Sequence, residues 1–152
     1  MGVDRSMSES EDIIDFRMVE LIDVNVPLPS QYAVVQLSEL ESPFRIVSVP
    51  IGLAEGAAVA LARENDIGVR PTTHELFSDV LERLNVDVIA LRITALVEGT
   101  FQAELDLMSP KGREILACRP SDGFILCLRQ SVPAPILVNA AILESENPNL
   151  EN

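Results

Sequence analysis

Two stretches of the chain place an arginine, a proline and a hydroxyl residue where a helical pattern begins. One is Arg70-Pro71-Thr72-Thr73-His74 and the other is Arg119-Pro120-Ser121-Asp122. Proline suits the first helical position, because its missing N–H would have no helical partner there. The open N–H groups of a helix start, next to an arginine, favour the binding of an anion. The two stretches therefore predict a shared anion site, provided that the fold brings them together.

His74 is the single histidine of the chain and lies in the first turn of its predicted helix. The positive end of the helix dipole disfavours the imidazolium, so the neutral ring could serve as a general base or acid. The alternative is a buried side chain without chemistry, because His74 lies on the same side of the helix as Phe77 and Leu81.

Carboxylates accompany the two arginines and allow more than one interpretation. Asp122, as third residue of its helix, caps the helix, binds a hard divalent cation or aligns an arginine, and Ser121 shares the capping alternative. Glu55 lies in an Ala-rich helical stretch, where it is either exposed or the buried partner of an arginine. Arg70 and Arg119 form either a phosphate clamp or structural salt bridges to Glu55 or Asp122.

Composition limits the setting of such a site. A chain of 152 residues, of which 47% are hydrophobic, suits one globular domain. The net charge of −13 argues against a broad basic surface for nucleic acid, but it is compatible with a small arginine-lined pocket. No apolar stretch reaches the length needed to cross a bilayer, so we expect no membrane partner. Cys118 and Cys127 lack CxxC spacing, which predicts two reduced, buried thiols in a cytoplasmic protein.

Hydrophobic periodicity predicts an α+β domain over residues 16–143, between a flexible acidic leader (1–15) and a flexible acidic tail (144–152). The alternating pattern predicts strands at 17–26, 32–37, 44–51, 89–95, 100–107, 114–118 and 136–138. Helical patterns begin near Leu53, at Thr72 and at Pro120, and a last helical turn ends at Leu143. Thr72 and Glu75 have the spacing of a capping box.

Four motifs resemble, in order and spacing from about residue 19 to residue 143, those of the bifunctional nuclease family of bacteria and plants. They are Ile51-Gly52-Leu53-Ala54-Glu55, Arg70-Pro71-Thr72-Thr73-His74-Glu75-Leu76, Glu98-Gly99-Thr100-Phe101-Gln102-Ala103 and Arg119-Pro120-Ser121-Asp122. The resemblance implies degradation of RNA and DNA, and a homo-oligomer. It also implies a strongly curved, nearly closed, mostly antiparallel sheet with three to four helices packed on it.

We therefore predict a nuclease that hydrolyses phosphodiester bonds of single-stranded RNA or DNA. His74 would be the base or acid, while Glu55 and Asp122 would bind Mg²⁺ or Mn²⁺ or orient the arginines. Apart from that cation we expect no cofactor. Four residues would hold the phosphate: Arg70, Thr73, Arg119 and Ser121. The alternative is a non-catalytic module for a small anionic ligand or a protein partner, which the net charge of −13 favours.

Overall fold

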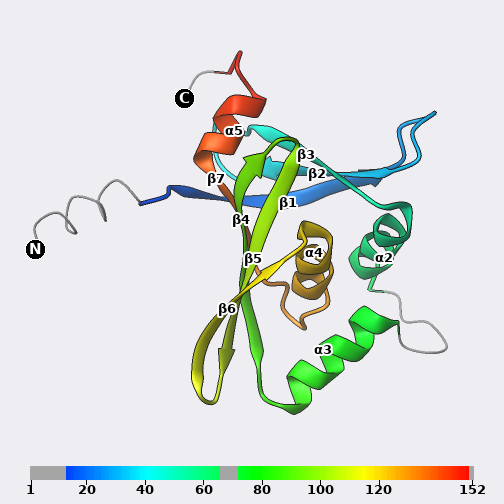
Figure 1. Ribbon diagram of the computed structural model, residues 1–152, viewed down its shortest axis with the longest axis vertical. Coiled ribbons are helices and arrows are strands. Elements are labelled where there is room, and N and C mark those ends of the chain that lie inside the picture. The colour runs from blue at the N-terminus through cyan, green and yellow to red at the C-terminus, as the bar shows by residue number, and fades with distance from the viewer. Residues whose placement is uncertain (1–12, 66–71, 151–152) are drawn as a thin grey trace, which may run out of the picture.

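The structure, a computed structural model, describes residues 13–65 and 72–150 of the chain. These residues contain seven strands and four helices, which confirms the α+β class (Figure 1). The strands are β1 (Phe16–Asn25), β2 (Ala33–Glu39), β3 (Ile46–Ile51), β4 (Asp87–Val97), β5 (Thr100–Ser109), β6 (Gly112–Cys118) and β7 (Ile136–Asn139). The helices are α2 (Leu53–Arg63), α3 (Thr73–Arg83), α4 (Pro120–Leu128) and α5 (Ala140–Glu146).

All seven strands belong to one mixed sheet, in the order β3-β2-β1-β7-β4-β5-β6. Only β4 and β7 pair in parallel, and the other neighbouring strands pair antiparallel. The short strand β7 joins the two halves, because Ile136 pairs with Val19 of β1 and with Leu91 of β4. A segment close to the end of the chain therefore holds the N-terminal meander against the central hairpin.

The sheet is open, so the prediction of a strongly curved and nearly closed sheet is wrong. Its edges are β3 and β6, which do not pair with each other. The physical reason is the position of two helices: α2 packs on β1 and β2, α4 packs on β4 and β5, and the two helices pack on each other. They fill the space that a closing sheet would need. In Figure 1 the strands β4 and β5 run across β1 and β2, with α2, α3 and α4 together on one side.

Helix α4 is the centre of the core, as its almost wholly apolar sequence predicts. Six of its nine residues are buried, and Phe124 is completely inaccessible to solvent. A side chain at Gly123 would overlap Leu91 of β4, so glycine is what allows this helix to lie close to the sheet. None of the helices in residues 13–65 and 72–150 is long and apolar enough to span a membrane.

Two clusters of ion pairs stabilise the sheet, and no sequence pattern predicted either of them. In the first, Glu39 accepts hydrogen bonds from the backbone N–H and the guanidinium of Arg45 and forms an ion pair with Arg17. In the second, Asp106 binds Arg113 through both carboxylate oxygens and also contacts Arg92. Both carboxylates are almost fully buried, so each depends on its arginines for compensation of its charge.

Candidate functional site

Helix α4 begins as the sequence predicts, with Arg119 as the N-cap residue and Pro120 as the first helical residue. Asp122 lies one turn further on and turns back to Arg119. The two side chains form a bidentate pair, in which Nε and Nη2 of Arg119 lie 3.0 and 3.2 Å from the Asp122 oxygens. Two parallel N–H···O bonds fix the plane of the guanidinium. Of the sequence-based alternatives for Asp122, the geometry favours alignment of an arginine.

Helix α3 brings the histidine to the same carboxylate. Its N-cap is Thr72, whose hydroxyl oxygen accepts the backbone N–H of Glu75, as the capping-box spacing predicts. His74 follows in the first turn, and its Nε2 lies 2.9 Å from Oδ1 of Asp122. The starts of the two helices therefore meet in space, which is the arrangement that the two Arg-Pro stretches predict.

Helix α2 contributes the second acidic side chain. Glu55 lies in its first turn, and Oε2 of Glu55 is 3.7 Å from Nη1 of Arg119. A side chain at Gly52, the N-cap residue, would overlap the Glu55 carboxylate. Glycine at this position thus leaves room for Glu55 to fold back over the start of its own helix. Arg119 is consequently held between two carboxylates that come from two different helices.

Electrostatics keep Asp122 ionised. Partial burial raises the pKa of Asp122, but hydrogen bonds from Arg119 and His74 outweigh burial, and the pKa lies below its ordinary value. A carboxylate can only accept hydrogen bonds, so the proton of the neutral imidazole is assigned to Nε2. Its other nitrogen, Nδ1, then carries the lone pair that could accept a proton.

Two pockets meet at this cluster. The larger has a volume of about 750 Å³ and is lined by the ends of β3 and β6, by the β4–β5 hairpin, and by Glu55, Arg119 and Ser121. The smaller has a volume of about 320 Å³ and is lined by residues of α3, β5, β6 and α4, with His74 and Asp122 among them. Ala117 and Cys118 line both pockets, so the two are neighbours along the end of β6.

The family of the chain follows from comparison with known proteins. A model of the bifunctional nuclease domain matches residues 35–151, which include every described residue of the cluster. The chain belongs to the bifunctional nuclease domain family. Two proteins of Mycobacterium tuberculosis, from strains CDC 1551 and H37Rv, are each 35% identical to it over 125 residues. The match covers 82% of this chain and 73% of each relative, and both relatives are described only as uncharacterized proteins.

In this bifunctional nuclease domain, some of the predicted site residues lie together and others do not. Glu55, His74, Arg119 and Asp122 form one connected cluster. Ser121 is buried and lines the larger pocket, whereas Thr73 is exposed and lines the smaller one. Arg70 lies outside the described residues, so the two-arginine clamp stays a prediction.

Several pocket residues were not among the predicted site residues. The hairpin segment Gly99–Ala103 lines the larger pocket. It could have been predicted from the sequence, because it belongs to the third family motif. Cys118 stands between the pockets and is half buried, and desolvation raises the pKa of its thiol to about 11. Both cysteines are free thiols, as predicted, but only Cys127 is buried, so the prediction that both thiols are buried is wrong for Cys118. A thiol with so high a pKa is a poor nucleophile at neutral pH.

A buried pair beneath His74 also escaped the sequence analysis. Glu75 follows His74 in α3 and is 3.7 Å from Nη2 of Arg129, the C-cap residue of α4. Both side chains are nearly inaccessible to solvent. Arg129 therefore connects α3 to α4. This contact lies one residue from the His74–Asp122 hydrogen bond and so supports its geometry.

The donor groups of the cluster suit a divalent cation poorly. Both oxygens of Asp122 already bind cationic or N–H groups, and Glu55 faces a guanidinium. Among residues 13–65 and 72–150, no three His, Cys, Asp or Glu side chains are grouped so that they could hold a metal ion. A hard cation requires several oxygen ligands, and it would have to displace Arg119 to gain Asp122. We therefore assign Asp122 to the arginine and the histidine.

Proposed function

We propose that the protein hydrolyses phosphodiester bonds of RNA and DNA at the cluster of Glu55, His74, Arg119 and Asp122. The observation that carries this proposal is the chain of contacts from guanidinium to carboxylate to imidazole, at the border of two pockets. An anion-binding group and a proton-transfer group thus share one carboxylate. Membership of the bifunctional nuclease domain family supports the same activity.

Arg119 would hold the phosphate. Its side chain is 65% exposed although it forms two hydrogen bonds to Asp122. A guanidinium has five N–H donors, so a bidentate carboxylate does not exhaust them. The start of α4 at Pro120 adds the positive end of a helix dipole to the same wall of the pocket. Positive groups that are fixed before the substrate binds stabilise the charge that develops on the phosphoryl oxygens.

His74 would act as the general base. With Nε2 donating to Asp122, its Nδ1 can take a proton from a water molecule while the water oxygen bonds to phosphorus. The bond from phosphorus to the leaving oxygen then breaks, and that oxygen takes a proton from solvent. Asp122 orients the ring and stabilises the imidazolium that forms, as carboxylates do in other catalytic histidine–carboxylate pairs. Glu55 helps to fix the position of Arg119.

A second candidate is a module that binds a small anion without hydrolysing it. The net charge of −13 favours this candidate, as does the presence of Glu55 and Glu104 in the lining of the larger pocket. Like charges repel a polyanion over its whole length, whereas a monophosphate meets only the local field of Arg119. In this case the same four residues would bind ligand and release it unchanged.

Cleavage of end-labelled single-stranded RNA and DNA by the purified protein separates the two candidates. The nuclease proposal predicts cleavage by the wild type and a loss of about 10²–10⁴-fold in rate for His74→Ala. Arg119→Ala should lose rate as well, because the developing charge is no longer stabilised. Arg83→Ala is the matched control, because it removes an exposed arginine near the end of α3, far along the helix from His74. Cleavage that is equal in all four proteins would contradict the proposal.

A further inference from the structure

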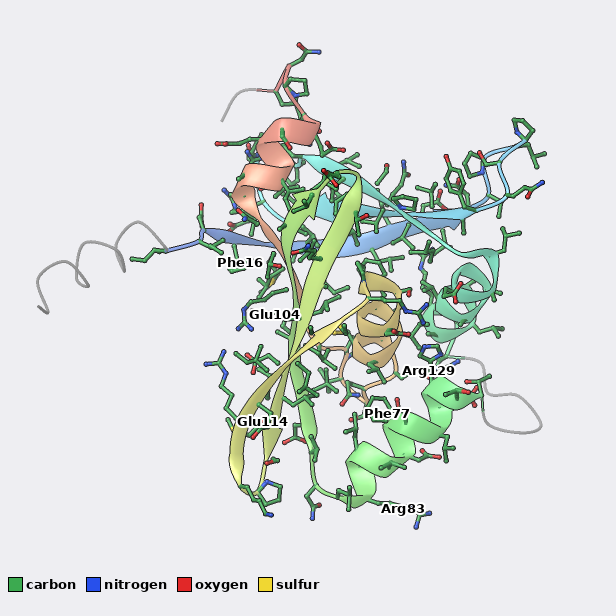
Figure 2. All side chains as sticks on the ribbon, viewed as in Figure 1. Phe16, Phe77, Arg83, Glu104, Glu114 and Arg129 are labelled. Atoms are coloured by element: carbon green, nitrogen blue, oxygen red, sulfur yellow. The ribbon has the colours of Figure 1, made fainter. Side chains whose placement is uncertain are left out.

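The smaller pocket differs in chemistry from the larger one. Its wall is largely apolar and is formed by Phe77, Leu105, Leu116, Ala117 and Leu126. Its polar side chains are few: Thr73, His74 and Asp122, of which the last two are hydrogen-bonded to each other. Figure 2 shows Phe77 on α3, on the side of the helix that is turned towards the sheet. A pocket with apolar walls and a few polar groups is typical of a site for a small organic ligand.

The position of this pocket relates it to the larger one. Both pockets are lined by Ala117 and Cys118, and the contacts of Asp122 with Arg119 and His74 bridge from one pocket to the other. A phosphodiester carries two organic substituents on one phosphorus. If the phosphate binds at Arg119, one substituent can extend into the larger pocket and the other can enter the smaller one.

The shape and chemistry of the smaller pocket select the group that would enter it. Its volume of about 320 Å³ is at the lower end of the range for ligand pockets and suits a single ring system better than a longer chain. Phe77 lines the pocket and is 43% exposed, so part of this aromatic residue is accessible to a ligand. A nucleobase has two apolar faces, which suit the wall, and a polar edge, which suits His74, Asp122 and the hydroxyl of Thr73.

We propose that the smaller pocket is a nucleobase pocket, which holds the base of a nucleotide whose phosphate lies at Arg119. This inference rests on the proposed function for the position of the phosphate. It assigns to Phe77 and Leu116 the role of positioning the substrate, a role that neither motifs nor family membership assign. The base stacks on Phe77, while the β5 and β6 side chains close the opposite face.

Binding measurements test the pocket without requiring turnover. We would measure the affinity of the full-length protein for adenosine 5′-monophosphate and for ribose 5-phosphate by calorimetry. The two ligands share the sugar and the phosphate, and only the first has a base. Wild-type protein should bind the nucleotide roughly tenfold or more tightly than the sugar phosphate, in line with the usual contribution of one stacked base.

The chain offers matched controls for the two pocket residues. Phe77→Ala and Leu116→Ala should lose most of the preference for the nucleotide, and Phe77→Leu should lose part of it. The controls are Leu76→Ala and Ile115→Ala, which replace neighbouring hydrophobic residues of comparable exposure, 56% and 46%, outside the pocket lining. Both controls should keep the preference of the wild type.

Three outcomes would overturn the proposal: equal affinity for both ligands, an equal loss of preference in control and pocket variants, or occupation of the pocket by a second copy. The last would appear as a dimer in sedimentation that Leu116→Ala dissociates. The oligonucleotide assay keeps this proposal separate from the proposed function. Cleavage without any preference for the nucleotide removes the base pocket only. A preference for the nucleotide without cleavage leaves the base pocket in place and removes the nuclease.

Discussion

Arginine–carboxylate pairs occur in two contrasting settings in this molecule. At Glu39 and Arg45 the side chains are 0% and 3% exposed, and they bind each other through two hydrogen bonds. At Arg119 and Asp122 the corresponding values are 65% and 30%, and the pair lies between two pockets. The bidentate geometry is nearly the same in both places. The difference lies in what else each guanidinium can reach.

This difference separates a structural role from a functional one. In the buried pair, desolvation is compensated by mutual contacts, so removal of one partner leaves an uncompensated charge inside the protein. In the exposed pair, solvent screens both charges, so the pair contributes little to stability. The guanidinium of Arg119 nevertheless lines a pocket in which a ligand could bind. Exposure at a pocket, rather than the presence of an ion pair, therefore makes Arg119 a candidate binding residue.

The comparison predicts opposite effects for two isosteric changes. Asp122→Asn should lower the rate of phosphodiester hydrolysis by about 10²–10⁴-fold, because His74 and Arg119 lose the charge that orients them. Its free energy of unfolding should change by less than about 1 kcal/mol. Parallel measurements of cleavage rate and urea unfolding check both values. A variant that unfolds readily but retains its rate per folded molecule would place Asp122 among the structural residues.

Glu39→Gln should show the reverse pattern. Arg45 would lose the carboxylate that pairs with it in the interior, and breaking such a buried pair costs about 3–5 kcal/mol in the free energy of unfolding. The rate per folded molecule should remain that of the wild type, because Glu39 is not among the residues that line either pocket. Urea unfolding of Glu39→Gln and of the exposed control Glu41→Gln is the measurement. Equal stability of the two variants would show that the buried pair is not needed.

Acid should unfold the protein through the buried carboxylates. Burial raises the pKa of Glu39, but the hydrogen bonds from Arg45 outweigh it, and the pKa is lowered. The hydrogen bonds from Arg113 lower the pKa of Asp106, against an opposing effect of burial. A lowered folded-state pKa means that stability is present above the ordinary value and is lost as the pH falls through the folded value. The free energy of unfolding should therefore drop below about pH 4, and less so in Glu39→Gln, as urea titrations from pH 7 to pH 3 would show.

The smallest expected effect concerns divalent cations. Because Asp122 already binds Arg119 and His74, removal of Mg²⁺ and Mn²⁺ with a chelator should change the cleavage rate by less than about twofold. The measurement is cleavage with and without chelator, after dialysis of protein and substrate. Complete loss of activity, restored by Mg²⁺ or Mn²⁺, would instead assign Glu55 and Asp122 to a metal ion, which was one of the sequence-based alternatives.

Local signals in the sequence were sufficient to predict most helices and strands, and motif spacing was sufficient to predict much of the candidate site. Pro120 and the Thr72–Glu75 spacing identify helix starts because they act through backbone N–H groups of the same turn. The alternation in the β4–β5 hairpin is equally local. Motif spacing then selected Glu55, His74, Arg119 and Asp122, which the structure places together.

Features that depend on long-range packing could not be predicted in this way. Nothing in the four residues of β7 indicates that they pair with both β1 and β4, and the sheet remains open because α2 and α4 pack on it and on each other. The partners of Glu39, Asp106 and Glu75 are likewise set by strand register and helix packing. The apolar pocket could not be predicted either, because in the sequence Phe77 and Leu116 are ordinary hydrophobic positions, and only the fold brings them to the lining of one pocket.

Chemical rescue of Arg119→Ala tests the central claim most directly, because it asks whether an exposed guanidinium at position 119 is required for cleavage. The variant should cleave single-stranded RNA and DNA slowly, and added guanidinium ion, at concentrations well below those that unfold the protein, should restore part of the rate. The pocket of about 750 Å³ has room for the ion. The same addition should leave His74→Ala slow. Wild-type activity of Arg119→Ala without guanidinium, or a folded variant that guanidinium does not rescue, would contradict the account.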